Sequence, residues 1–566
     1  MSTVAAHLTA LVQQAAERAG FEGVTVDGCL PTKDASLGDY QSNTAFRLAK
    51  SKGMKPRDAA EALRANFPED PAVTGVEVAG PGFLNLSVDD AWLAAAVRTV
   101  ASPGVGAGKT VVIDYSSPNI AKRMHIGHLR STIIGNALDR MHRWLGYRVI
   151  ADNHVGDWGT PFGKLIVAWQ EWRDEAAYAE DPVGELQRLY QLADEKMEAD
   201  PSLLERARAE TVKLQQRDPE TLALWQRFVD ASMAEFDVVY GRLGIRFDEV
   251  LGESAYQDRL DPLVAELLER GIAVESQGAI VVPLEEKGLT DHPLLIQKAD
   301  GAKLYGTTDL ATIEHRLATW APTRVLYVVD TRQQLHFRCV FAAARKMGSS
   351  GDFVHVWFGM LKFPGGAVAS SRKGVTANLL DVLDTAAERA YAVITEKSPE
   401  LPEEERRAVA EVVGTATIKY FDLSQNPQSD ITFDWDRALA HDGGSAVYLQ
   451  YAYARLHSIL RAGGAAETPP DVLPAHTEGP EKALLRLVAR LPEVVQSAAE
   501  TCKPNLLAEY LETVARAVGP FYEHCPVLKD GVAPEVRATR LSLVSVVANT
   551  LEVGLGLLGI GVVPRL

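Results

Sequence analysis

Residues 110–155 read TVVIDYSSPNIAKRMHIGHLRSTIIGNALDRMHRWLGYRVIADNHV. The segment opens with an apolar run typical of a buried strand. From Gly127 apolar residues recur at helical spacing until Gly146, and a second apolar run begins at Arg148. Strand, helix and strand in this order predict a βαβ unit, the start of a parallel, doubly wound sheet. The later runs GAIVVP, RVLYVVD and VHVWFGM predict further strands.

The regions on either side of this unit have different patterns. Residues 1–95 predict a small α/β domain, whose stretch TGVEVAGPGFLNLSV suggests paired strands around the Pro81-Gly82 turn. Residues 105–405 predict a Rossmann-like domain that carries a charged helical insertion at about 163–245. Residues 406–566 show almost only helical periodicity. The predicted fold class is therefore α/β, with a Rossmann-like parallel-sheet domain between a small α/β domain and an all-α domain.

Composition limits the partners of the chain. Its formal net charge of −17 argues against a non-specific nucleic-acid coat protein, which is usually basic. Residues 116–148 nevertheless contain six Lys and Arg against one acid, Asp139, which favours selective docking of an anion. None of the four cysteines lies at metal-ligand spacing from another, so we expect reduced thiols and no structural zinc.

Membrane and targeting signals are not expected. The first twenty residues have helical spacing and lack a basic, apolar leader pattern. The most apolar stretch, LSLVSVVANTLEVGLGLLGIGVVP, contains Asn549, Glu552 and several glycines. We interpret it as a buried helix and its tail, not a membrane span.

The tetrapeptide His125–His128 falls where a parallel sheet binds ligands, beyond a strand end and at a helix N-terminus. Gly127 would let a base or ribose approach the backbone. His125 and His128 are three residues apart, so both can face one side of the first turn and donate hydrogen bonds to phosphate oxygens. The alternative is a pair of histidines that only caps a helix. The nearby GVGAGKT is not a P-loop, because Pro103 replaces the first glycine and a strand follows it.

A second basic segment, VASSRKGVTANLLDVLD, spans residues 368–384. Its polar loop contains Arg372 and Lys373, ends in Gly374 and precedes a helical pattern. Such a loop can close over a triphosphate and steady the leaving pyrophosphate. The alternative is a solvated surface turn.

Together these two segments resemble the HIGH and KMSKS motifs of class I aminoacyl-tRNA synthetases. The resemblance to arginyl-tRNA synthetases spans nearly the whole chain. It is carried by SSPNIAKRMHIGHLRSTIIGN, DNHVGDWGTPFGKL, LYGTTDLATIEHR, VVDTRQQLHF and VHVWFGM in the middle of the chain. LGDYQSNTAFRLAK and GPGFLNLSV resemble the tRNA-binding N-terminal domain of that family, and GGSAVYLQYAYARLHSIL and LGLLGIGVVPRL its anticodon-binding helical domain.

The resemblance implies a set of site residues. The arginine side chain would bind Glu253, Tyr305 and Asp309, because paired carboxylates suit a planar guanidinium. Asn153 and Gln333 would hold the amino and carboxyl ends of the substrate, with Asn119 at the same strand end. The implied ATP-binding residues are His125, Gly127, His128, Arg372 and Lys373. Contacts with tRNA would come from Tyr448, Tyr451 and Arg455, although YLQYAYARL also has the spacing of a helix core.

The implied reaction has two steps. Arginine attacks the α-phosphate of ATP to give arginyl-adenylate and pyrophosphate, and a terminal ribose hydroxyl of tRNA(Arg) then takes the arginyl group. Mg²⁺ would enter with ATP, since phosphoryl transfer needs charge neutralisation more than a protein nucleophile. The family also implies that arginine activation requires bound tRNA. A cytoplasmic monomer without membrane contacts is expected.

Two positions depart from the family pattern. Val368 stands where KMSKS begins with lysine, and we predict that Lys122, just before HIGH, supplies the missing charge. Arg123 stands where the family usually has proline. These departures leave open a catalytically impaired, RNA-binding paralogue. A nucleotidylyltransferase that uses no tRNA and a class I synthetase for another amino acid are further alternatives, which the helical C-terminal region and the acidic side-chain pocket respectively disfavour.

Overall fold

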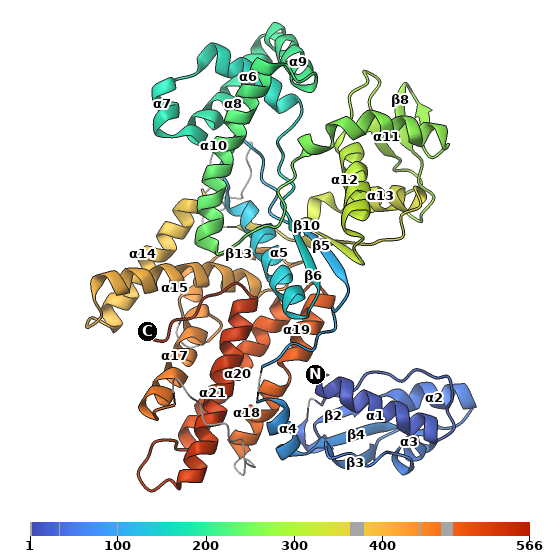
Figure 1. Cartoon of the computed structure of the whole chain (residues 1–566), viewed down its shortest axis with the longest axis vertical. Coiled ribbons are helices and arrows are strands. Elements are labelled where there is room, and N and C mark those ends of the chain that lie inside the picture. Colours follow the sequence, from blue (N-terminus) through green and yellow to red (C-terminus); the bar gives the residue numbers. More distant parts are fainter. Residues whose placement is uncertain are drawn as a thin grey trace.

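The computed structural model describes residues 3–32, 34–98, 100–362, 378–440, 443–465 and 479–565 (Figure 1). Its centre is a four-stranded parallel sheet in the order β11-β10-β5-β6, which confirms the predicted parallel architecture. The strands are β5 (Thr110–Asp114), β6 (Arg148–Asp152), β10 (Arg324–Asp330) and β11 (Asp352–Phe358).

The sheet is buried on both faces, as a doubly wound fold requires. In β5, Val111 and Ile113 enter one hydrophobic core while Val112 between them enters another. Helix α5 (Ile126–Trp144) covers the first face. It approaches closely because a Cβ at Gly135 would lie 2.2 Å from the Tyr115 ring. The helix that begins at the HIGH tetrapeptide is therefore fixed against the strand that precedes it.

One predicted strand belongs to a different sheet. GAIVVP forms β8 (Ala279–Val282), which pairs antiparallel with β7 (Val274–Ser276) and β9 (Leu294–Gln297). Gln277 and Gly278, both at positive φ, connect β7 to β8 as a two-residue hairpin. A connection this short allows only antiparallel pairing, so β8 cannot join the parallel sheet. This small sheet lies with helices α11 (Gln257–Glu269), α12 (Tyr305–Trp320) and α13 (Gln334–Lys346) in one lobe (Figure 1).

The N-terminal region contains the predicted α/β unit. Its antiparallel sheet has the order β1-β2-β4-β3, and β3 and β4 are joined by the expected Pro81-Gly82 turn. The strands are β1 (Leu30–Pro31), β2 (Tyr40–Ser42), β3 (Val73–Ala79) and β4 (Phe83–Val88). They are accompanied by α1 (Val4–Arg18), η1 (Ala35–Leu37), α2 (Thr44–Lys52), α3 (Pro56–Ala65) and α4 (Asp90–Ala96).

The insertion is helical, as its charged periodicity indicates, and forms the upper lobe of Figure 1. Three of its helices begin with an aspartate N-cap followed by proline at the first helical position, a strong local start signal. The helices are α6 (Thr160–Trp172), α7 (Glu175–Glu180), α8 (Pro182–Ala199), α9 (Pro201–Gln215) and α10 (Pro219–Leu243).

Beyond Lys397 the chain is mainly a helical bundle. Helix α14 (Leu379–Lys397) precedes the bundle. The helices of the bundle are α15 (Glu403–Leu423), α16 (Trp435–Ala438), α17 (Ala446–Ala462), α18 (Gly479–Ala489), α19 (Leu491–Glu500), α20 (Asn505–His524) and α21 (Pro534–Leu557). One exception to the predicted helical pattern is β13 (Ile431–Thr432), which pairs in parallel with β12 (Leu361–Lys362). Two residues are too few to produce a strand periodicity in the sequence.

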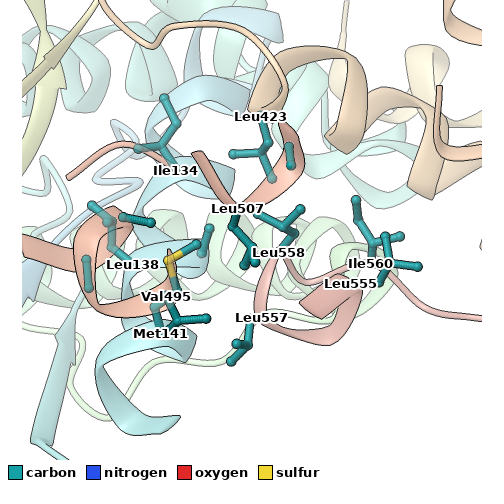
Figure 2. Close-up of a cluster of buried hydrophobic side chains, with 14 of the residues drawn as sticks. Ile134, Leu138, Met141, Leu423, Val495, Leu507, Leu555, Leu557, Leu558 and Ile560 are labelled. Atoms are coloured by element: carbon teal, nitrogen blue, oxygen red, sulfur yellow. The ribbon is translucent and has the colours of Figure 1, made fainter. Parts of the chain in front are cut away.

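The bundle shares its core with the HIGH helix. Figure 2 shows Ile134, Leu138 and Met141 of α5 in one buried cluster with Val495, Leu507 and Leu555 of the C-terminal helices. Helix α21 is long and apolar enough to cross a membrane by length and composition alone, but 72% of its most apolar window is buried inside the protein. This confirms the prediction of a buried helix.

Candidate active site

A cavity of about 580 Å³ opens at the carboxyl edge of the parallel sheet. The loop after β5, the N-terminus of α5, the short helix η2 (Glu253–Tyr256), α12 and η3 (Thr331–Gln333) all contribute to its wall. Ligands of open α/β sheets bind at this edge. Eight predicted site residues line it together: Asn119, His125, Gly127, His128, Glu253, Tyr305, Asp309 and Gln333.

The two histidines of the HIGH tetrapeptide close the N-terminus of α5 as a reciprocal cap. The Nδ1 atom of His125 accepts a hydrogen bond of 3.0 Å from the Gly127 amide. The Nδ1 atom of His128 accepts one of 3.1 Å from the His125 amide. Because Nδ1 is an acceptor in both rings, a neutral imidazole carries its proton on Nε2. Capping and ligand binding are thus compatible: the cap leaves each ring one free N–H donor.

Both rings are held neutral. Burial is the largest cause that lowers the pKa of His128, to about 3, and the charges of His125 and Lys122 lower it further. Burial and the charges of Lys122 and Arg332 likewise lower the pKa of His125. The rings, whose centroids lie 3.9 Å apart, are therefore fixed hydrogen-bond donors and not proton carriers near neutral pH.

An acidic group of side chains lies on another part of the wall. Burial, and then the charges of Asp157 and Asp309, raise the pKa of Glu253 to about 8. Tyr305 and Asp309 are four residues apart on α12 and share a face, and the two carboxylates Glu253 and Asp309 also raise the Tyr305 pKa after burial. This partly buried acidity suits a ligand that brings a positive charge.

Two further residues support this acidic group, and the sequence did not single them out. His336 Nε2 lies 2.5 Å from Asp309 Oδ2. Burial opposes the charged form of His336, but its contact with Asp309 outweighs burial and raises the pKa of His336. Asp157 accepts hydrogen bonds from the Ser254 amide and hydroxyl and so fixes the turn that carries Glu253. His336 stands in the quoted stretch VVDTRQQLHF, and Asp157 in DNHVGDWGTPFGKL. His336 comes three residues after Gln333, a spacing that puts two side chains on one helix face, so the sequence could have placed it beside the site.

Asn153 is not on the cavity wall. It is buried, its Oδ1 accepts from the Ser117 amide at 3.0 Å, and its Nδ2 donates to the Tyr240 hydroxyl at 3.1 Å. Ser116 and Ser117 both have positive φ, a strained conformation for residues other than glycine. In the structure Asn153 supports this strained turn, which carries Asn119 to the cavity.

The two departures from the family pattern lie against the insertion. Lys122 is half-buried, with Nζ 4.2 Å from the centroid of the Tyr190 ring on α8. Its charge reaches both histidines, as their pKa shifts indicate. The guanidinium of Arg123 contacts Asp181 and lies 3.8 Å from Glu235. The charge of Arg123 therefore binds carboxylates at α8 and α10. These contacts also fix the turn before the HIGH tetrapeptide, which lacks the rigid proline that the family usually has at position 123.

The predicted residues Arg372 and Lys373, and Val368 before them, lie outside the described residues. The predicted tRNA contacts lie on α17. Tyr451 is 53% exposed, and the exposed Arg455, one turn later, stacks 3.8 Å from the centroid of the Tyr522 ring. Tyr448 is half-buried. Tyr453 by contrast is buried and donates to Glu552, so the core interpretation holds for that tyrosine.

Three protein families match consecutive parts of the chain. The N-terminal domain of arginyl-tRNA synthetase matches residues 6–88, the catalytic domain of class I (R) tRNA synthetases residues 93–435, and the DALR anticodon-binding domain residues 449–566. Arginine–tRNA ligase of Fusobacterium nucleatum is 42% identical over 94% of this chain and 94% of its own length. The ligase of Chloroflexus aggregans is 44% identical over 91% of each chain.

Solved structures agree in fold. The arginyl-tRNA synthetase of Plasmodium falciparum superposes with a TM-score of 0.82 at 25% identity, and that of Thermus thermophilus with a TM-score of 0.85 at 24% identity. Each comparison covers 100% of both chains. The parallel sheet, the capped histidine pair and the acidic wall thus occur in a chain whose full length matches this group. The chain belongs to the arginyl-tRNA synthetase family of class I.

Proposed function

We propose that the protein is an arginine–tRNA ligase, which activates L-arginine with ATP and transfers it to tRNA(Arg). The observation that carries this proposal is the placement of Glu253 and Asp309 on the same cavity as two neutral histidine donors. A guanidinium neutralises the acidic wall and can form paired hydrogen bonds with carboxylates. An apolar or acidic side chain would bring no positive charge to Glu253, whose pKa is raised by burial.

The histidines suit the first step of the reaction. Attack of the arginine carboxylate on the α-phosphate forms a new P–O bond and breaks the bond to the leaving pyrophosphate. Negative charge builds on the phosphate oxygens, and two fixed Nε2–H donors would stabilise it without rearranging. Gly127 leaves room for the nucleotide beside the α5 N-terminus, whose dipole favours an anion. Arg372 and Lys373 would contact the phosphates, and Gln333 and Asn119 the backbone ends of arginine.

The remaining partners follow from this reaction. Mg²⁺ would enter on the phosphates of ATP. We also propose that the protein works as a cytoplasmic monomer without structural zinc or membrane contacts. The impaired-paralogue alternative gains no support, since the relatives named above are ligases and Arg123 has a structural partner in Asp181.

Aminoacylation tests the proposed function directly. Purified protein, ATP and Mg²⁺ are incubated with unfractionated tRNA and each labelled amino acid in turn. We expect label in acid-precipitable tRNA with arginine alone. Charging of tRNA with a different amino acid, or with none, would contradict the proposal.

Arginine binding is expected to depend on pH through Glu253. In the free protein its pKa is raised to about 8, so at pH 7 the carboxyl mostly holds a proton. A bound guanidinium favours the ionised form and expels that proton. Affinity for arginine should therefore fall by up to about tenfold per unit as pH drops below 8, and level off above it.

Calorimetry at pH 7 in two buffers of different protonation enthalpy measures this proton release. His336 also has a raised pKa and touches Asp309, so it is a second possible source. Glu253→Gln separates the two: we expect it to abolish most of the buffer dependence. Binding heats that are independent of buffer in the wild-type protein would contradict a protonated Glu253.

The exposed face of α17 is expected to contact tRNA. Tyr451→Ala removes an exposed ring and should raise KM for tRNA(Arg) by about tenfold, since stacking on a base contributes about 1–3 kcal/mol. KM for ATP should not change. Tyr522→Ala, which removes the partner ring of Arg455, tests whether the stack presents that arginine. An unchanged KM for tRNA in both variants would place the contact elsewhere.

A further inference from the structure

A buried ion pair joins the HIGH helix to the C-terminal bundle. Arg130 of α5 is 1% exposed, and its Nε lies 2.9 Å from a carboxylate oxygen of Asp422. Its Nη1 donates to two backbone carbonyls, of Gly359 at 2.7 Å and of Ser429 at 3.0 Å. Asp422 lies in the last turn of α15. One side chain thus ties together three segments that are distant in sequence.

The carbonyl of Gly359 belongs to the cavity wall. Gly359, Met360 and Leu361 follow β11 and line the cavity together with His125 and Gly127. This wall is hydrogen-bonded to the segment after α15: the Gly359 amide donates to Pro427 O, and the Ile431 amide to Met360 O. A Cβ at Gly359 would lie 2.5 Å from the Ser429 carbonyl oxygen, so the two backbones are in close contact.

Asp430 adds a second and more exposed attachment. Its Oδ1 accepts from the Met360 amide at 2.7 Å, although its side chain is 49% exposed. Residues 422–431 therefore hold the Gly359–Leu361 wall from outside the Rossmann-like sheet. The same α15 packs against α17, the helix with the exposed Tyr451.

We propose that Arg130 and Asp422 are positioning residues for the nucleotide: they hold the Gly359–Leu361 wall at the correct distance from the HIGH helix and attach it to α15. The inference rests on the proposed function, because it concerns the ATP side of that cavity. A displacement of about 1 Å in a substrate-binding wall can cost roughly a hundredfold in rate. Stability alone does not explain why the pair is buried, because well-packed apolar residues can often replace a buried ion pair without a loss of folding free energy.

Two variants separate positioning from folding. Asp422→Asn keeps the shape and an acceptor but removes the charge. Asp430→Ala removes the half-exposed attachment of Met360 and should leave the fold intact. Glu481→Gln is the matched control, because Arg540 Nε lies 2.6 Å from Glu481 in another buried pair, between α18 and α21 and away from the cavity wall.

The main readout is the affinity for ATP, measured by calorimetry on the full chain. The second readout is KM for ATP and for arginine, measured by tRNA-dependent pyrophosphate exchange. We expect ATP binding to weaken at least about tenfold in Asp422→Asn and severalfold in Asp430→Ala, with KM for arginine within about twofold. Glu481→Gln should change neither, even where its Tm falls.

Unchanged ATP affinity in both cavity-wall variants would overturn the proposal. An equal loss in Asp422→Asn and Glu481→Gln would also overturn it, by showing a general effect of a lost buried charge. If Asp422→Asn does not fold, Asp430→Ala tests the attachment of the wall to residues 422–431, and unchanged ATP affinity in that variant would overturn the proposal. Wild-type protein that binds ATP but shows no exchange with arginine would count against the proposed function, and the calorimetric comparison would still test the wall.

Discussion

Replacing Glu253 with glutamine is expected to lower kcat/KM for arginine by about 100- to 1,000-fold. The amide keeps the size of the side chain but removes the negative charge that is proposed to pair with the guanidinium. A buried, charge-assisted pair is lost and the cationic ligand is left partly uncompensated, which is the situation in which polar specificity is largest. Steady-state pyrophosphate exchange in the presence of tRNA measures the loss, which should fall mainly on KM for arginine.

Glu314→Gln is the matched control for this experiment. Glu314 also lies on α12, the helix of Asp309, but its carboxylate pairs with Arg259 at 2.6 Å and it is not on the cavity wall. We expect kcat/KM for arginine within about twofold of wild type, as for a surface ion pair. A Glu253→Gln enzyme with near-normal kcat/KM would show that arginine is recognised by other residues.

Replacing Lys122 with alanine is expected to cut arginyl-adenylate formation by at least about 100-fold, the loss typical of one transition-state contact to a phosphate. Lys122 rests on Tyr190 and its charge reaches His125 and His128, so it stands beside the donors proposed to bind the phosphates. Burial lowers its pKa while the charge of Asp194 opposes that shift. The effect should appear in kcat for pyrophosphate exchange more than in KM for arginine.

Lys213→Ala, in the insertion that Lys122 packs against, provides the control for the general effect of losing a lysine from this region. Lys213 lies on α9, is exposed, and pairs at 2.8 Å with the buried Glu210, away from the cavity wall. We expect no change in exchange rate. A near-normal rate in Lys122→Ala would show that Lys122 does not replace the lysine missing at Val368.

The sequence predicts local features of the fold well and long-range ones poorly. The β5–α5–β6 unit follows from apolar periodicity and from Gly146, which ends the helix at positive φ. The pairing of β12 with β13 leaves no periodic signal, because each strand has two residues. The sequence predicts β8 as a strand but not as part of a separate antiparallel sheet, because an apolar run does not show which strands it pairs with.

The same limit applies to the site. His125 and Asp309 were found because they stand in quoted motifs, and Glu253 because it stands in GESAY at residues 252–256. The structure places all three on one cavity. The contact between Arg130 and Asp422 joins residues 292 apart in sequence, so no local pattern could show it. Asn153 was expected to face the substrate but is buried beneath the turn of Ser117. A polar side chain at a strand end can bind the ligand or can stabilise the turn that follows the strand. Only the packing around the side chain shows which of the two roles it has.

Arginine-specific activation is measured by ATP–pyrophosphate exchange with each of the twenty amino acids, with and without total tRNA. We expect exchange with arginine alone, and only when tRNA is present. Exchange with another amino acid, or none from folded protein that still binds tRNA, would contradict it.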